Sequence, residues 1–143
     1  MKIENIKQKA EYCLNCKTKP CRTGCPLQNN IPSFIKNIKE GNYKEAVNVL
    51  AETTIFEPIC GRICPHKSQC EGSCVRGIKG ESVQIGDLEV SVGDFIIENK
   101  IKQNVESTNG KRIAVIGSGP SGLAVSNYLS VRGYLVTIYE KHS

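Results

Sequence analysis

Residues 13–25 read CLNCKTKPCRTGC and residues 60–74 read CGRICPHKSQCEGSC, and these two stretches contain all eight cysteines of the 143-residue chain. The first block has the spacing CxxCxxxxCxxxC, and the second has the spacing CxxxCxxxxxCxxxC. A proline directly follows Cys25 and Cys64, as in the cluster-binding loops of bacterial-type ferredoxins. Thiolates are soft ligands that select iron–sulfur clusters or zinc over hard cations. The spacing therefore favours iron–sulfur clusters.

Disulfides and zinc are the alternatives for such cysteines. Disulfides are typical of secreted chains, but the first twelve residues mix charges and lack the apolar core of a signal peptide. Structural zinc prefers pairs of CxxC knuckles, and only Cys13 and Cys16 have that spacing. A zinc-stabilised interaction module without a redox role stays open as the second hypothesis.

Charge and hydropathy narrow the class of protein. The net charge is +5, but the lysines are scattered among acids and only 6% of the residues are aromatic. This pattern does not indicate a nucleic-acid-binding protein, and an acidic partner is the second interpretation of the positive charge. No apolar run approaches the roughly 20 residues that cross a bilayer. We therefore expect a soluble, cytoplasmic protein without membrane contact.

Apolar periodicity predicts several helices in the cysteine-rich part. Residues 31–40 carry Ile31, Phe34, Ile35 and Ile38 at helical spacing, with a proline in the first turn and Gly41 directly after. Residues 43–56 repeat the pattern after Asn42, so the two helices should pack as a hairpin that holds the cysteine blocks together. Further helices are predicted over residues 2–12 and 87–99, and residues 101–110 should form a linker.

The pattern changes after residue 110 to strand, glycine-rich turn, helix and strand. An apolar run at residues 113–116 precedes GSGPSG, and a second run covers residues 134–139. Glu140 follows the second strand about 20 residues after the glycines, which is the context of a dinucleotide-binding fingerprint. Pyrophosphate should lie at the helix N-terminus and Glu140 should bind a ribose. The predicted cofactor-binding residues are Gly117, Ser118, Gly119, Pro120, Ser121, Gly122 and Glu140.

The cysteine blocks together with KRIAVIGSGPSGLAVSNYL and TIYE resemble the N-terminal part of the glutamate synthase small-subunit family. This family includes the N-terminal region of dihydropyrimidine dehydrogenase. The resemblance implies a mainly α fold, in which an α-helical ferredoxin-like domain (residues 1–106) carries two [4Fe-4S] clusters. The truncated start of a Rossmann-type FAD domain (residues 107–143) follows it.

The resemblance also implies a ligand set that crosses between the blocks. One cluster would take Cys13, Cys16, Cys21 and Cys74. The other would take Cys25, Cys64, Cys70 and, in place of a fourth thiolate, Glu89. Cys60 is left over as a buried thiol, and an ordinary surface carboxylate is the alternative for Glu89, with Asp87 nearby.

The resemblance implies an NAD(P)H-dependent oxidoreductase similar to glutamate synthase. Hydride would pass from NAD(P)H to FAD, and single electrons would pass through the clusters to a partner subunit or domain. The NAD(P)H site would lie outside this chain, which we interpret as an inactive fragment of a longer protein.

No residue is predicted as a catalytic acid, base or nucleophile. Arg62 is expected to neutralise cluster charge or to bond a sulfide, and an ordinary exposed arginine is the alternative. His66 is expected to donate a hydrogen bond near the cluster or to lie on the surface, and ligation of iron is the alternative.

Overall fold

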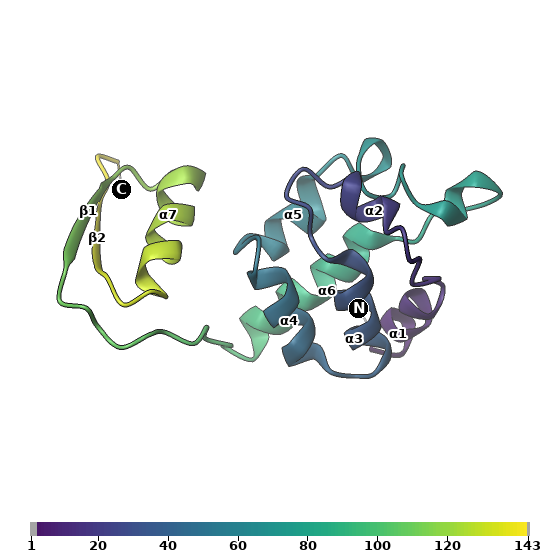
Figure 1. Cartoon of the computed structure of the whole chain (residues 1–143), viewed down its shortest axis with the longest axis horizontal. Coiled ribbons are helices and arrows are strands. Elements are labelled where there is room, and N and C mark those ends of the chain that lie inside the picture. The colour runs from purple at the N-terminus through teal and green to yellow at the C-terminus, as the bar shows by residue number, and fades with distance from the viewer. Residues whose placement is uncertain (1–2, 143) are drawn as a thin grey trace. The chain divides into compact units, whose positions relative to one another are not determined.

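The computed structural model describes residues 3–142 and divides the chain into two compact units, of which the first ends at Ile101 and the second begins at Lys102. The first unit is helical (Figure 1). Its elements are α1 (Ile3–Glu11), α2 (Pro20–Thr23), α3 (Ile31–Lys39), α4 (Tyr43–Ala51), α5 (Glu57–Ile63), the 3-10 turns η1 (His66–Ser68) and η2 (Val75–Ile78), and α6 (Ile85–Glu98).

Helices α3 and α4 form the predicted hairpin. Pro32 lies in the first turn of α3, where a missing N–H costs nothing. Gly41 adopts a φ of 77° just after the helix, a conformation that glycine reaches without strain. The apolar side chains predicted for α3 are all at most 2% exposed, and Leu50 of α4 is fully buried. Packing of these two stripes forms the centre of the core.

Helix α6 passes through the first unit and contacts α1, α4 and α5 (Figure 1). Leu88 and Val92 are fully buried on its core-facing side, as the apolar stripe predicts. The helix begins two residues earlier than the sequence prediction, at Ile85, which is itself 2% exposed. Lys9 of α1 forms an ion pair with Asp87, so the N-terminal helix is fixed to the start of α6. These contacts place residues 87–94 beside α5.

The second unit is a strand–helix–strand unit. Strands β1 (Arg112–Ile116) and β2 (Leu135–Tyr139) pair in parallel, with Ala114 opposite Thr137. Helix α7 (Pro120–Ser130) connects them and packs on both strands. The predicted order of strand, turn, helix and strand is therefore present in the structure.

Residues 101–110, predicted as a linker, contain no helix or strand. They are nevertheless bonded to the second unit. The Gln103 side chain accepts a hydrogen bond from Asn127, and the Glu106 N–H donates to the Val131 carbonyl. This segment therefore belongs structurally to the strand–helix–strand unit. In the part of the chain that the structure describes, no helix is both long and apolar enough to cross a membrane.

Candidate metal centres and dinucleotide loop

Four cysteines from both sequence blocks line one cavity, which we call cavity A. Cys13, Cys16 and Cys21 come from the first block, and Cys74 comes from the end of the second block. The rest of the lining is mainly apolar and comes from α3 and the segment before α6, for example Ile31, Ile35, Val83 and Ile85. The fold thus places the last cysteine of the chain beside the first three.

Arg76 is the charged residue that lines cavity A. Its guanidinium lies 4.2 Å from the centre of the Tyr12 ring, and its Nε donates a 3.0 Å hydrogen bond to the Tyr12 carbonyl. The Lys39 ammonium donates a 2.7 Å hydrogen bond to the Cys13 carbonyl. These two cations hold the chain at the point where it enters the first cysteine block.

The remaining four cysteines line a second cavity, cavity B. Cys25 comes from the first block, and Cys60, Cys64 and Cys70 come from the second. His66 and Glu89 line the same cavity, and Glu89 lies on α6. The structure therefore gathers every residue proposed for the second ligand set in one place, with Cys60 and His66 as two further donors there. All eight cysteines are free thiols in the structure.

Glu89 is a buried carboxyl group that forms no ion pair with the residues that the structure describes. It is 6% exposed, and its Oε1 has no hydrogen-bond partner among the described residues. Burial raises the pKa of Glu89 to about 7, and the nearby carboxylate of Glu57 raises that pKa further. Asp87, the sequence alternative to Glu89, instead points to Lys9 and has a half-exposed side chain. Burying an unpaired carboxyl group is unfavourable, so the arrangement suits a cation that Glu89 can bind.

Burial also dominates the acidity of the thiols. It raises the pKa of Cys21 in cavity A to about 11. In cavity B it raises the pKa of Cys60 to about 11 and that of Cys70 to about 12. Such thiols are protonated at neutral pH, and binding to a metal would release their protons.

Three glycines bring α6 close to α5 and to the loop that follows it. A Cβ atom at Gly93 would lie 2.6 Å from the Pro58 Cα, and one at Gly61 would lie 2.6 Å from the Val90 amide nitrogen. At Gly86 the same atom would lie 2.7 Å from the His66 ring. These contacts position the helix that carries Cys60 against the helix that carries Glu89.

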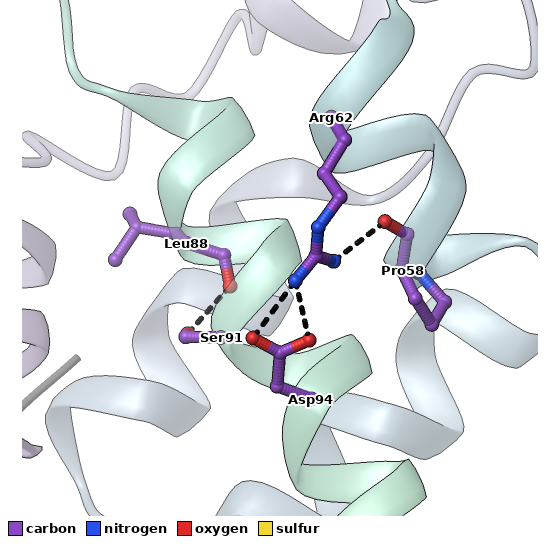
Figure 2. A network of polar contacts seen from close by, with 5 residues as sticks. All are labelled: Pro58, Arg62, Leu88, Ser91 and Asp94. Atoms are coloured by element: carbon purple, nitrogen blue, oxygen red, sulfur yellow. Dashed lines mark hydrogen bonds and ion pairs between the residues drawn. The ribbon is translucent and has the colours of Figure 1, made fainter.

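Arg62 contributes to this contact between α5 and α6 (Figure 2). Its Nη2 donates to both carboxylate oxygens of Asp94 at 2.8 and 3.0 Å, and its Nη1 donates to the Pro58 carbonyl at 2.8 Å. Arg62 does not line either cysteine cavity, and its expected effect on cluster charge stays a prediction.

Sequence reasoning missed Glu57, which is 3% exposed at the start of α5. Burial raises the pKa of Glu57 to about 6. His66 was noted in the sequence, and its Nε2 is buried without a hydrogen-bond partner among the described residues. An apolar pattern cannot reveal either group, since neither belongs to a hydrophobic stripe.

The three glycines of the dinucleotide-binding fingerprint are suited to their positions for different reasons. Gly117 has a φ of 95°, which makes the turn after β1 possible. A Cβ atom at Gly122 would lie 2.0 Å from the Gly117 carbonyl oxygen, so only glycine fits where α7 meets the turn. At Gly119 the same atom would meet nothing within 4 Å, which leaves the backbone open to a ligand.

Glu140 lies next to this loop. One of its oxygens accepts hydrogen bonds from the Ser118 N–H at 2.8 Å and the Ser118 hydroxyl at 2.9 Å. The other accepts from the backbone N–H groups of Lys141 and His142. These bonds, led by that of His142, lower the pKa of Glu140 to about 2. The carboxylate predicted to bind a ribose is thus ionised and held at the glycine loop.

Comparison with known proteins decides the family. Residues 1–101 match the family described as dihydropyrimidine dehydrogenase domain II, 4Fe-4S cluster. The chain belongs to this family. Residues 115–143 match an NAD(P)-binding Rossmann-like domain. The predicted resemblance is confirmed, and the helical unit belongs to a class of domain that carries iron–sulfur clusters.

Individual relatives are oxidoreductases or their subunits. The NADPH glutamate synthase small chains of Escherichia coli and Azospirillum brasilense are 33% and 37% identical over 95% and 97% of this chain. The PreT subunit of an NAD-dependent dihydropyrimidine dehydrogenase from Escherichia coli is 37% identical over 95% of it. The chain spans 29%, 30% and 33% of the length of these three relatives, respectively.

The residues present fit iron–sulfur clusters. Within residues 3–142, no group of three or more histidine, cysteine or acidic side chains is arranged to hold a single metal ion. The donors instead surround two cavities, and cavity B contains an orphaned buried carboxyl oxygen. Thiolates with one carboxylate are a donor set that suits iron.

Proposed function

We propose that the chain is the electron-transferring part of an NAD(P)H-dependent flavin and iron–sulfur oxidoreductase, similar to the glutamate synthase small chain. Its helical domain would hold two [4Fe-4S] clusters, and the domain from residue 107 would begin an FAD site. When bound, the clusters would supply one-electron carriers between FAD and a partner subunit or domain. The NAD(P)H site would lie in a part of the protein beyond this chain.

The observation that carries the proposal is the division of the cysteines between the two cavities. Each cavity takes residues from both blocks, in the grouping that the family resemblance implies. Cys13, Cys16, Cys21 and Cys74 would bind one cluster in cavity A. Cys25, Cys64, Cys70 and Glu89 would bind the other in cavity B, and Cys60 would stay a thiol beside it.

The chain's residues would set the environment of each centre. The lining of cavity A is mainly apolar, and solvent exposure is one of the factors that set cluster potentials. In cavity B, Glu89 would supply a hard oxygen donor on a helix that the Arg62–Asp94 pair fixes to α5. Arrangements that orient a ligand in this way also tune the metal.

The second unit supports the flavin part of the proposal. Gly119 leaves the loop open where a pyrophosphate would approach, and Glu140 is ionised beside it. Ile116, Leu135 and Tyr139 of the sheet are 82%, 46% and 58% exposed. Apolar strands of a parallel sheet are normally covered on both faces, so we propose that further elements of the whole protein cover them.

Anaerobic purification followed by analysis of iron, sulfide and zinc, with a visible spectrum, tests the proposal. We expect about eight iron and eight sulfide per chain, as two four-iron clusters require, and broad absorption near 400 nm. Stoichiometric zinc in a colourless protein from iron-supplemented cells would instead support the zinc-stabilised module.

A further inference from the structure

The chain around the first three cysteines of cavity A carries only positive charge. No aspartate or glutamate occurs between Glu11 and Glu40. Two of the cations in this stretch are engaged, because Lys36 pairs with Glu40 and Lys39 binds the Cys13 carbonyl. Of the other three, Lys17 and Arg22 directly flank Cys16 and Cys21, and Lys19 donates a 3.4 Å hydrogen bond to the Asn30 side chain.

The turn η2 contributes Arg76, and a further cation, Lys79, directly follows the turn. Arg76 lines the cavity, and Lys79 is exposed three residues later. We call Lys17, Lys19, Arg22, Arg76 and Lys79 the basic rim. Among the described residues, none of these five forms an ion pair. The acids nearest to the rim in sequence are Glu11, Glu40, Glu71 and Glu81. Of these, Glu40 already pairs with Lys36, so the five cations of the rim outnumber the remaining three acids.

Exposed apolar side chains accompany the basic rim. Leu14 and Val75 line cavity A and are 52% and 37% exposed, and Ile78 is 77% exposed. Protein interfaces commonly combine an apolar centre with a polar or charged rim. The surface at cavity A has both parts.

The surroundings of the rim favour a protein over a nucleic acid. Recognition of single-stranded nucleic acid relies on aromatic rings on which bases stack. Tyr12 is the aromatic residue next to the first block, and the Arg76 guanidinium already lies over its ring at 4.2 Å. Residues 13–33 contain no aromatic side chain.

We infer that the basic rim is the docking surface for a partner protein with an acidic face. Carboxylates of the partner would face Lys17, Arg22 and Lys79, and its apolar centre would cover Leu14 and Val75. The inference rests on the proposed function, since a partner in this position would lie beside the thiols of cavity A and could accept electrons there. Complementary charge would both speed the encounter and select the partner.

A pair of probe proteins that differ mainly in charge tests the inference. Native cytochrome c is basic, and succinylated cytochrome c is an acidic form of the same protein. The dissociation constants of both for the full chain are measured calorimetrically at low ionic strength, with all proteins oxidised. We expect the succinylated form to bind about tenfold or more tightly than the native form, and added salt to remove the difference.

Charge reversal locates the contact. The triple variant Lys17→Glu, Arg22→Glu and Lys79→Glu should weaken binding of succinylated cytochrome c by about tenfold or more. The matched control, Lys44→Glu, Lys102→Glu and Lys111→Glu, makes the same change in net charge at exposed lysines outside both cysteine cavities. We expect the control to change binding by about twofold or less, because screening weakens distant charges. If the reversal triple and the control triple weaken binding of succinylated cytochrome c equally, the inference is overturned.

Lys19 and Arg76 are left unchanged, because Lys19 has a φ of 47° and Arg76 holds Tyr12. If the reversal variant does not fold, the glutamine triple at the same three positions replaces it. The contrary outcome is a reversal variant that binds succinylated cytochrome c as the unmodified protein does, but binds a 20-base-pair DNA duplex more weakly. That result would assign the basic rim to nucleic acid and overturn the inference. The iron analysis tests the proposed function separately, because probe binding requires no electron transfer.

Discussion

Cavities A and B are built from the same two cysteine blocks, yet their donors differ. Cavity A offers four thiols within an apolar lining, whereas cavity B combines thiols with His66 and the buried carboxyl group of Glu89. Cluster potentials respond to ligand type, charge and solvent exposure. The two clusters proposed for these cavities are therefore expected to differ in reduction potential, although both take their thiols from the same two blocks.

The largest effects are expected from replacing single cysteines with alanine. Cys74→Ala and Cys13→Ala should each remove about half of the iron and abolish the same electron paramagnetic resonance signal of the reduced protein, because both side chains line cavity A. Cys25→Ala should abolish the other signal. Cys60→Ala is the control and should keep all of the iron. If Cys25→Ala and Cys13→Ala remove the same signal, the blocks do not cross.

The carboxylate of cavity B provides the next test. Glu89→Ala should lose iron from that centre only, and Glu89→Gln should alter the signal of that centre, because the oxygen donor is removed or becomes neutral. Asp87→Asn, two residues earlier on α6, should leave iron content and both signals unchanged, since Asp87 pairs with Lys9. Equal spectra for Glu89→Ala and the unmodified protein would show that Glu89 is not a ligand.

Gly93 allows a selective disturbance of cavity B through packing alone. Gly93→Ala would place a Cβ atom 2.6 Å from the Pro58 Cα and push α5 away from α6. We expect a loss of roughly 1–3 kcal/mol in the free energy of unfolding, typical of overpacking, as measured by urea denaturation of the holoprotein. The signal from cavity B should broaden while that from cavity A persists. At Gly80 a Cβ atom would meet only the Tyr12 hydroxyl, at 4.0 Å, so Gly80→Ala is the control.

The smallest effect is expected from the ion pair in Figure 2. The side chains of Arg62 and Asp94 are 49% and 40% exposed, and pairs of that exposure contribute up to about 1 kcal/mol. A double-mutant cycle with Arg62→Ala and Asp94→Ala should give a coupling free energy in this range, reduced by salt. A coupling near zero would mean that the glycine contacts alone fix α5 to α6.

The helices that sequence predicts well are those with a buried apolar stripe and clear ends. In α3, Phe34 and Ile38 are buried, a proline opens the helix, and Gly41 follows it. Helix α5 was missed for the opposite reason. Its apolar residues Ile59 and Ile63 are 50% and 74% exposed, whereas its buried residue is Glu57. Periodicity of hydrophobic residues cannot identify a helix whose inner face is a carboxyl group and small residues.

The candidate site, like the helices, is predicted only in part by the sequence. Spacing alone indicated that the cysteines bind clusters or zinc, but it grouped them by block. In the structure Cys74 lies with the first three cysteines and Cys25 with the second block, which requires contacts between distant segments that no local pattern contains. Glu89 came from the resemblance, and its burial without a partner is a property of the folded core.

If each cluster takes ligands from both cysteine blocks, the path of the chain would determine how the two clusters assemble. Each cluster would join the segment before the α3–α4 hairpin to the segment after it, as a disulfide joins distant parts of a small secreted domain. Closing a long loop in this way removes conformations from the unfolded chain. The first cluster to bind would therefore bring the residues of the other cavity together in advance. Loading of iron should then be cooperative, with few molecules that hold only one cluster.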